Sequence, residues 1–270
     1  MLENGDVSDL KAMSSMAEFD DKPDAYVQDF LGYVPASERY NTENIDPYEA
    51  GVLIASLVPS GARVLDVGCG TGFNSSLVRQ QRNADVVCIE PEPERAEAAR
   101  KKGLPVHQGY LTNKLAETLG KFDVVLFVDV LEHLANPGHL IRVAAKALCD
   151  DGRLVISVPN AAHWSVRASL LFGRFEYDQY GIMDATHLRW YTRSSLDGFL
   201  CNVGFRIEKQ KYTAGTTLPV YSRNMICRMM SRNLRDKIVK RLSQSVPTLF
   251  ACQFVVSAGR ANALPLCEAG

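Results

Sequence analysis

The sequence predicts an α/β fold, in which helices cover both faces of a largely parallel sheet. Two observations predict it. Short apolar runs alternate with segments of helical composition between residues 63 and 159, the order expected of parallel strands joined by crossover helices. A glycine cluster directly follows the first apolar run, at the strand end where open α/β sheets bind ligands. With 270 residues, 46% of them hydrophobic, the chain suits one large domain.

The expected elements follow in order along the chain. Strands are expected at the apolar runs of residues 63–67, 85–89, 106–108, 122–128 and 152–159. Helices are expected at residues 73–81, 93–102 and 137–148, the second closed by a glycine and the third begun by a proline. Beyond residue 192 the alternation changes. Residues 194–203 predict a helix, residues 205–212 a strand, and residues 247–258 a long apolar strand that ends the fold.

Three segments fall outside this alternation. Residues 1–45 are polar with scattered tyrosines and predict an N-terminal arm or lid before a main domain of residues 46–270. Residues 160–192 form a long connection, which predicts a lid-like insertion. Residues 213–246 carry seven Lys and Arg side chains against one acid, Asp236, with apolar residues at near-helical spacing. This basic helical insertion either packs on the core or on a second subunit, or docks on a membrane surface.

Composition excludes several classes of protein. The net charge of −1 gives no general attraction to nucleic acid. The seven cysteines are odd in number and scattered, without Cys-x-x-Cys pairs, which indicates reduced thiols in a cytoplasmic protein. The first residues lack the apolar run of a signal peptide, and no apolar run reaches the length of about 18 residues that spans a membrane. We therefore expect a soluble cytoplasmic protein, as a monomer or a homodimer.

The turn DVGCGTG, residues 66–72, is the strongest functional signal in the chain. Glycines let the backbone approach a ligand closely and aim free N–H groups at it. The dinucleotide fingerprint would need glycine where Phe73 stands, and a P-loop would need Gly-Lys followed by Ser or Thr. The turn instead has an acidic residue, Asp66, two positions before its first glycine, and Glu90 ends the second expected strand. This spacing predicts a nucleoside site with Glu90 on the ribose hydroxyls.

Three stretches together resemble the class I S-adenosylmethionine-dependent methyltransferases: LDVGCGTG at 65–72, IEP at 89–91 and FDVVLFVDVLEHL at 122–134. A fourth, FGRFEYDQYGIMDATHLRWYT at 172–192, resembles small-molecule methyltransferases of the ubiquinone-synthesis-like subgroup. The resemblance implies a Rossmann-like, seven-stranded, mostly parallel sheet whose last two strands form an antiparallel pair. It also implies S-adenosyl-L-methionine as the cofactor.

The resemblance further implies a set of cofactor-binding residues: Asp66, Gly68, Cys69, Gly70, Glu90, Pro91, Tyr110, Leu111, Asp129 and Val130. Asp66 would hold the cofactor's ammonium group, and Glu90 would accept both ribose hydroxyls. Tyr110 or Leu111 would flank the adenine through apolar contact or backbone bonds, because the acid that the family often carries there is absent. Asp129 would border the transferred methyl group.

The segments after the fourth and fifth expected strands narrow the choice of acceptor. Methyltransferases of nucleobase amines carry Asn/Asp-Pro-Pro-Tyr after the fourth strand, where this chain reads DVLE. Metal-dependent catechol methylation needs clustered carboxylates, but the fifth strand is followed by Asn160. Methylation of a small-molecule hydroxyl without a metal fits best. The alternatives are N- or C-methylation of a natural-product intermediate, and a cofactor-binding partner subunit without activity.

A hydroxyl acceptor needs a base whose pKa lies near 7, and histidine is the natural choice. The candidates are His187, with Asp184 placed to orient its ring, His163 after the fifth strand and His133 after the fourth. Two interpretations of His187 stay open: a base at the mouth of the pocket, or part of an ion-paired brace that ties the lid to the sheet. A structural hydrogen bond is the alternative role for His133.

Overall fold

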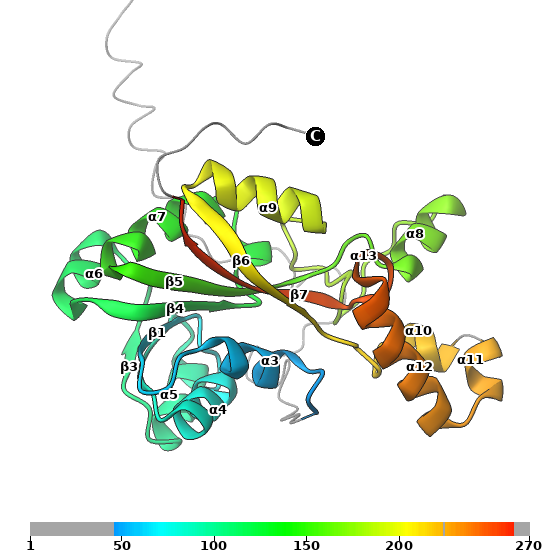
Figure 1. The fold of residues 1–270 in the computed structure, drawn as a ribbon, viewed down its shortest axis with the longest axis horizontal. Helices are drawn as coiled ribbons and strands as arrows, with labels where there is room; N and C mark the ends of the chain where they lie inside the picture. Colours follow the sequence, from blue (N-terminus) through cyan, green and yellow to red (C-terminus); the bar gives the residue numbers. More distant parts are fainter. Residues whose placement is uncertain (1–45, 224, 262–270) are drawn as a thin grey trace, which may run out of the picture.

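The computed structural model describes residues 46–223 and 225–261, so the expected N-terminal arm lies outside the described residues. One sheet has the strand order β3-β2-β1-β4-β5-β7-β6 (Figure 1). The strands β1 to β5 pair in parallel, and β7 runs antiparallel to both of its neighbours, β5 and β6. This seven-stranded topology confirms the predicted fold. The strands are β1 (Arg63–Val67), β2 (Asp85–Glu90), β3 (Val106–Gln108), β4 (Phe122–Val128), β5 (Leu148–Pro159), β6 (Phe205–Tyr212) and β7 (Gln253–Arg260).

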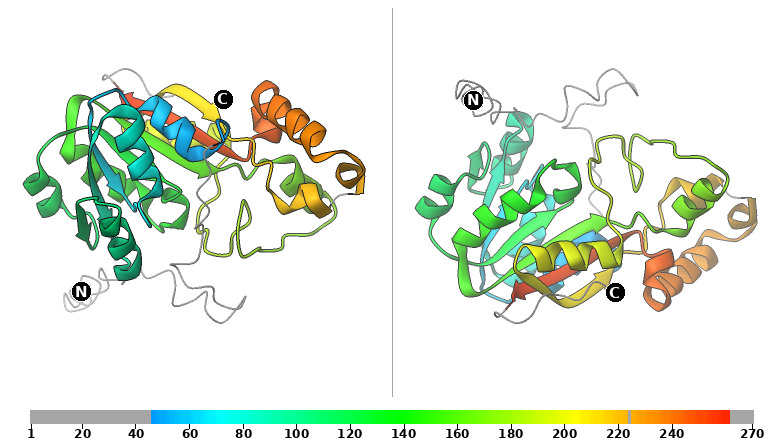
Figure 2. Two further views of the ribbon diagram at one scale, coloured as in Figure 1. Left: turned by 90° about the horizontal axis from the view of Figure 1, so that it is seen from below. Right: turned by 90° about the horizontal axis from the view of Figure 1, so that it is seen from above.

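Helices cover both faces of the sheet (Figure 2). The helices α3, α4 and α5 contribute to the hydrophobic core on one face, and α6, α7 and α9 to the core on the other. The described helices are α3 (Ala50–Leu57), α4 (Phe73–Arg82), α5 (Pro93–Lys101), α6 (Asn113–Leu119), the 3₁₀ helix η2 (Leu131–His133), α7 (Pro137–Ala147), α8 (Trp164–Leu171), α9 (Arg193–Asn202), α10 (Pro219–Arg223), α11 (Met225–Met229), α12 (Arg232–Ser245) and α13 (Pro247–Phe250).

The strand β4 shows why this part of the sequence is continuously apolar. Val124 and Leu126 pack in the core on the α3–α5 face, whereas Val125 and Phe127 pack in the core on the opposite face. Successive side chains of a strand point to opposite faces, so a central strand covered on both sides needs apolar residues at both parities. The side chains of β4 therefore pack in the cores on both faces of the sheet, and the strand ends at Val128, next to the candidate site.

The expected strand over residues 247–258 is wrong in its first part. Pro247 begins the short helix α13, and β7 starts at Gln253. The Nδ2 group of Asn160 donates to the carbonyl of Ala251 at 2.8 Å, with longer contacts to the carbonyls of Pro247 and Thr248. Carbonyls at the end of a helix have no partner within it, so this buried amide stabilises the turn that leads into β7.

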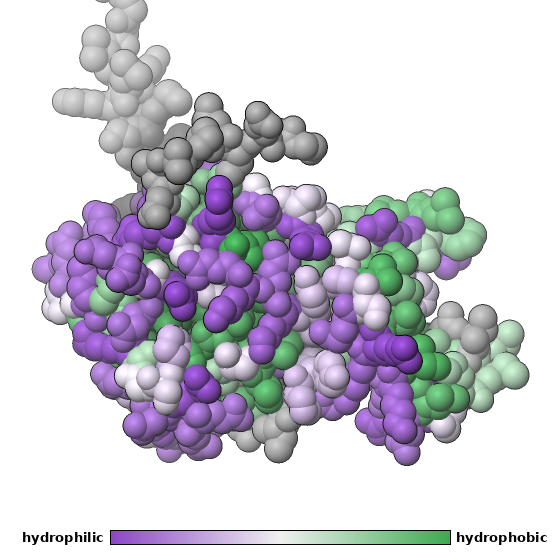
Figure 3. All heavy atoms as spheres, in the orientation of Figure 1, coloured by the Kyte–Doolittle hydropathy of each residue, from purple (hydrophilic) through white to green (hydrophobic). Residues whose placement is uncertain are grey.

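The helix α8 and the segment α10–α12 project together beyond the ends of β5 and β7 (Figures 1 and 2). Figure 3 shows apolar residues gathered at their outer ends. Met225 and Met229 of α11 are 75% and 83% exposed, and Leu171 at the end of α8 is 82% exposed. Within the described ranges, no helix combines the length and apolar character needed to cross a bilayer.

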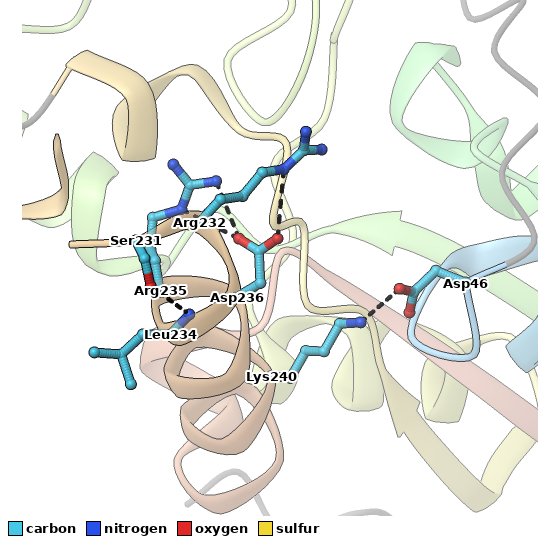
Figure 4. A network of polar contacts seen from close by, with 7 residues as sticks. All are labelled: Asp46, Ser231, Arg232, Leu234, Arg235, Asp236 and Lys240. Carbon is cyan, nitrogen blue, oxygen red and sulfur yellow. Dashed lines mark hydrogen bonds and ion pairs between the residues drawn. The ribbon is translucent and has the colours of Figure 1, made fainter.

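An ion-pair network joins α12 to the start of the described chain (Figure 4). Arg232 and Arg235 both contact the carboxylate of Asp236 within α12. One turn further on, the ammonium of Lys240 lies 2.5 Å from the carboxylate of Asp46 and 5.3 Å from the centre of the Tyr48 ring. The segment before α3 is thereby fixed against α12.

Candidate active site

The glycine turn lies between β1 and α4 and has the backbone geometry that its sequence predicts. Gly68, Gly70 and Gly72 have φ angles of 81°, 56° and 77°, in the left-handed region that favours glycine. A Cβ atom on Gly68 would stand 2.8 Å from Cγ2 of Val130, the second residue after β4. The first glycine of the turn therefore lets the ends of β1 and β4 approach each other closely.

Asp66, in β1, is almost completely buried below this turn. Its Oδ2 atom accepts a hydrogen bond of 2.5 Å from the hydroxyl of Ser75, in α4. Its buried Oδ1 atom has no hydrogen-bond partner among the described residues. Burial raises the pKa of Asp66 to about 7, against the opposing effect of the Ser75 hydroxyl. A buried acceptor without a donor is unfavourable, and a ligand's ammonium group would supply that donor.

Glu90, at the end of β2, is tied to the same turn. Its Oε2 atom accepts the N–H of Gly70 at 2.7 Å, and its Oε1 atom accepts the N–H of Glu92 at 2.9 Å. Burial raises the pKa of this carboxyl group, and the two N–H donors oppose the rise. Each carboxylate oxygen can accept more than one hydrogen bond, so the anchored group keeps acceptor capacity for a diol.

The remaining residues of the predicted cofactor set lie around these two carboxylates. Cys69 is buried in the turn, where the contact with Cys88 and burial raise the pKa of its thiol, so it stays neutral. Pro91 directly follows β2 and is half-buried. Of the two adenine-flanking candidates after β3, Tyr110 is 54% exposed whereas Leu111 packs in the core. The exposed ring of Tyr110 is thus the one that a ligand could reach at that edge.

Asp129 directly follows β4 and has an unusual backbone. Its φ of 54° is positive, which among the described non-glycine residues is shared only with Asn83. Its Oδ1 atom accepts hydrogen bonds from the hydroxyl of Ser157 at 2.7 Å and from Nε2 of Gln253 at 2.8 Å. Burial raises the pKa of Asp129, although both donors favour the ionised form. Neighbouring strands thus hold this carboxylate in place.

A buried cluster joins the end of β4 to the 160–192 connection. Ligand atoms of Glu132, His133 and His187 all lie within 4.8 Å of one another. Glu132 is 1% exposed, neither of its carboxylate oxygens has a hydrogen-bond partner among the described residues, and burial raises its pKa well above the usual value. A carboxylate and two imidazoles are groups that could bind a divalent cation.

The histidine-bearing stretch lies directly on this end of β4. The backbone N–H groups of Leu188 and Arg189 donate to the carbonyl of Glu132 at 2.7 and 2.9 Å. Asp184 accepts the N–H and the hydroxyl of Thr186, and that hydroxyl lies 3.1 Å from Nδ1 of His133. The structure therefore connects Asp184 to His133 through Thr186.

His187 is buried in the same cluster. Its Nδ1 atom lies 3.2 Å from the carbonyl of Ile182, a distance at which an Nδ1–H group donates. The lone pair of the neutral ring would then lie on Nε2. The His187 ring also packs on Trp190, at 5.6 Å between ring centres, and edge-on against His133 at 4.9 Å. The structure thus brings together two of the three predicted histidines, His133 and His187.

His163 lies apart from this cluster, at the start of α8. Its Nδ1 atom contacts Ser165 and caps the helix, and its Nε2 atom lies 3.4 Å from the hydroxyl of Tyr221. Burial lowers the pKa of His163 to about 4. Both ring nitrogens therefore have protein partners, and the ring stays neutral at physiological pH.

Aromatic side chains line a cavity of about 470 Å³ between α8, the following connection and the start of α10. Its lining includes Trp164, Phe172, Phe175, Tyr177 and Tyr180, but no residue of the glycine turn or the histidine cluster. The cavity therefore lies beside the cofactor motifs rather than within them.

Four polar side chains of the site were not among the sequence predictions: Ser75, Glu132, Ser157 and Gln253. Ser157 and Gln253 reach Asp129 from other strands, so only the strand order reveals these contacts, whereas Ser75 reaches Asp66 from the helix that follows β1. Glu132 lies in the stretch LEHL, directly before the predicted site residue His133. An acidic residue within an apolar stretch is the feature of the sequence that could have identified it.

Comparisons with known proteins agree with this geometry. A family model described as a methyltransferase domain matches residues 38–210, well over half of the chain. Over 122 residues the chain is 36% identical to a protein named ubiquinone biosynthesis O-methyltransferase from Xanthomonas axonopodis pv. citri. That match covers 43% of this chain and 51% of the relative. A protein of the same name from Xylella fastidiosa is 38% identical over 114 residues, covering 40% of this chain and 46% of the relative. The chain spans about half the length of the curated relatives it matches.

Solved structures share the fold at low sequence identity. A S-adenosylmethionine-dependent methyltransferase from Archaeoglobus fulgidus has a TM-score of 0.50 and 18% identity, covering 77% of this chain and 94% of that one. A chain from a complex of the Haloferax volcanii Trm112 methyltransferase activator with a methyltransferase has a TM-score of 0.52 and 13% identity, covering 78% and 88%.

The seven-stranded fold is the one that these solved methyltransferase structures share. The chain belongs to the methyltransferase domain family, whose model matches residues 38–210.

Proposed function

We propose that this protein transfers the methyl group of S-adenosylmethionine to a hydroxyl of a small molecule, without a metal ion. The observation that carries the proposal is the buried oxygen of Asp66, which has no hydrogen-bond partner in the described part of the chain, together with the anchored carboxylate of Glu90. These two groups offer acceptors for the ammonium and the ribose of one ligand. The curated relatives named O-methyltransferases support oxygen as the methylated atom.

The proposed cofactor contacts lie at the ends of the neighbouring strands β2, β1 and β4 and after β3. Asp66 takes the ammonium group and Glu90 the ribose hydroxyls, while the backbone of Gly68 to Gly70 lines the methionine part. Tyr110, rather than the buried Leu111, is the residue that flanks the adenine. Asp129 and Val130 border the methyl group, because Val130 contacts the turn at Gly68.

S-adenosylmethionine supplies a methyl group on a sulfonium, a good leaving group, so the protein's task is positioning, exclusion of water and removal of one proton. His187 is the proposed base. With Nδ1–H donating to the carbonyl of Ile182, the lone pair of the neutral ring lies on Nε2, which is the atom proposed to accept the hydroxyl proton as the oxygen attacks the methyl carbon. His133, linked through Thr186 to Asp184, is the second candidate in the same cluster.

A methyl-transfer assay against a panel of phenols, sugars and amines tests the proposal most directly. The expected result is transfer to one or more hydroxyl compounds, with the methylated atom identified by mass spectrometry and NMR. Transfer only to amines or to carbon would support the alternative of N- or C-methylation. S-adenosylmethionine binding without transfer to any compound would support a partner subunit without activity, and absence of binding would contradict both.

We further propose that the basic segment of residues 213–246 contacts a membrane surface or a lipid-bearing acceptor. We also propose that the protein is a monomer or a homodimer. The exposed methionines of α11 and the arginines of α12 support an interfacial role. Flotation with anionic lipid vesicles at low and high salt tests it, and no association at low salt would contradict it.

The cytoplasm is the proposed compartment, and small-molecule biosynthesis the proposed setting. Free thiols at Cys69, Cys88, Cys149 and Cys252 support a reducing compartment. Cys201, which is disulfide-bonded, is the exception. Mass spectrometry of the alkylated protein from freshly lysed cells would measure the redox state of each cysteine, and a fully oxidised set would contradict this compartment.

A further inference from the structure

The cavity beside the histidine cluster has a mixed chemical character. The helices α8 and α10, which supply two of its walls, project beyond the ends of β5 and β7 (Figure 2). A third wall is formed by five consecutive residues, in which charged and aromatic side chains alternate: Arg174, Phe175, Glu176, Tyr177 and Asp178. The volume of about 470 Å³ is in the range of small-molecule sites.

The aromatic side chains of this cavity are exposed rather than packed in a core. Phe172 is 77% exposed, Phe175 48% and Tyr177 46%. Exposed apolar groups that gather around a hollow mark ligand grooves or interaction sites. The rings of Phe175 and Tyr177 also contact each other edge to face, with their centres 5.6 Å apart. The two rings therefore support each other as one surface of the cavity.

The charged side chains of the same wall are open to a ligand. Among the described residues, those of Arg174, Glu176 and Asp178 form neither a hydrogen bond nor an ion pair, although both signs of charge occur along the wall. An apolar tail in this cavity would take these groups out of water without replacing their hydrogen bonds, which is unfavourable. A ligand rich in hydroxyl groups would replace them, because a hydroxyl both donates to a carboxylate and accepts from a guanidinium.

The cavity wall also contacts the proposed base. The ring of Trp190 packs on Phe175 and Tyr177, at 5.8 and 6.2 Å between ring centres. The same ring packs on His187 at 5.6 Å. Ile182 lines the cavity, and its carbonyl lies 3.2 Å from Nδ1 of His187. The wall and the base are thus parts of one packed unit, which places a ligand of the cavity next to the proposed reaction.

We propose that this cavity is the acceptor site and that the acceptor is a sugar. The inference rests on the proposed function and names the class of its substrate. A pyranose presents C–H groups on one face, which favour the electron-rich face of an aromatic ring, and hydroxyl groups around its edge. The aromatic side chains would hold the ring face, and the charged side chains between them would bind the hydroxyls. A phenol or a long apolar chain would use the aromatic rings but leave most of the charged groups without a partner.

Tryptophan fluorescence tests the inference, because both tryptophans of the chain lie at this cavity. Trp164 lines it and Trp190 packs on its wall. The probes are the methyl glycosides of glucose, galactose, mannose and glucuronic acid, with catechol as a phenol and geraniol as an apolar alcohol for comparison. All are titrated in the presence of S-adenosylhomocysteine. At least one glycoside is expected to change the emission to saturation and to bind about tenfold or more tightly than catechol and geraniol.

Substitutions on the wall connect this binding to the cavity. Asp178→Asn and Arg174→Gln each remove one charge and should weaken the glycoside about fivefold or more, because hydrogen bonds to charged groups are the stronger ones. Phe175→Leu removes a flat aromatic face and should also weaken it. These positions are exposed, so thermal unfolding should match that of the wild type. Asp151→Asn, at an exposed position of β5, is the matched control and should leave the dissociation constant unchanged.

The outcomes separate this inference from the proposed function. If no glycoside changes the emission, or if catechol or geraniol binds more tightly than every glycoside, the acceptor is not a sugar and the inference is overturned alone. It is also overturned alone if a glycoside binds but none of the three wall variants weakens it, because the sugar then binds elsewhere. If calorimetry detects no binding of S-adenosylmethionine, the proposed function is overturned, and the acceptor role of the cavity with it, whatever the cavity binds.

Discussion

Replacing Asp66 with asparagine should stabilise the ligand-free protein at alkaline pH and weaken its binding of S-adenosylmethionine. The carboxylate is buried, one of its oxygens has no partner among the described residues, and burial raises its pKa to about 7 from 3.8. A folded-state pKa above the unfolded value means that the folded protein holds this proton more tightly. The stability that the proton provides is fully present below about pH 4 and is lost as the pH rises through about 7.

The size of the effect on stability follows from the shift in the pKa of Asp66. One pKa unit corresponds to about 1.4 kcal/mol, so the raised pKa of Asp66 costs the folded protein on the order of 4 kcal/mol above about pH 8, where the buried group ionises. At about pH 5 the cost is on the order of 1 to 2 kcal/mol, because the folded protein keeps a proton that the unfolded chain releases. Asparagine has no charge to desolvate. The difference in unfolding free energy between Asp66→Asn and the wild type should therefore grow by about 3 kcal/mol, in favour of the variant, between these two pH values.

Urea unfolding of both proteins at about pH 5 and about pH 8 measures this difference, provided that the two m-values agree. A difference that is the same at both pH values would refute the argument, because it would show that Asp66 does not titrate between them. Calorimetry provides a second check. Wild-type affinity for S-adenosylmethionine should rise between about pH 5 and pH 7, as Asp66 ionises, and the variant should lose this rise.

Further predictions concern the cofactor, the metal and the base. Glu90→Gln should weaken S-adenosylmethionine binding by about 1–3 kcal/mol in calorimetry, whereas the neighbouring Glu92→Gln, which leaves the backbone donor intact, should not. Turnover should survive EDTA; a loss that Mg²⁺ restores would contradict the metal-independent proposal and point to the cluster around Glu132. His187→Ala should lower kcat by about 10²- to 10⁴-fold with cofactor affinity kept, and should remove a limb of the pH–rate profile near neutrality. If His187 is only a brace, the variant should instead lose thermal stability and raise the acceptor's KM while the pH profile persists.

The elements around the glycine turn could be predicted because their patterns are local. β4 is apolar at every position that the core requires, and the bounds of β3, β4 and β6 agree with the expected ones. The helices α6 and α8 were missed because each is short and lacks a clear apolar period. A signal did exist for α6: the hydroxyl of Thr112 accepts the N–H of Leu115, which is the N-cap pattern that a threonine before a helical stretch can indicate.

The site shows a similar division. The turn, Asp66 and Glu90 could be named as candidates because they occur at fixed spacing near single strand ends. The partners of Asp129 could not, since Gln253 lies 124 residues away and reaches Asp129 only because β7 inserts between β5 and β6. The role of His163 depends on Tyr221, from a segment whose position the sequence left open. Candidate groups that lie close together in the sequence could be predicted, whereas contacts between residues that only the strand order brings together could not.

The insertion of β7 has a consequence for synthesis of the chain on the ribosome. β6 is made long before β7, but it pairs only with β7, so it has no place in the sheet until residues 253–260 have emerged. Until then the apolar strand β5 also presents one unpaired edge. Exposed strand edges are where nascent chains aggregate or recruit chaperones. A ribosome that stalls before residue 253 would therefore release a chain with most of its length, but with the edge of β5 unpaired and β6 outside the sheet.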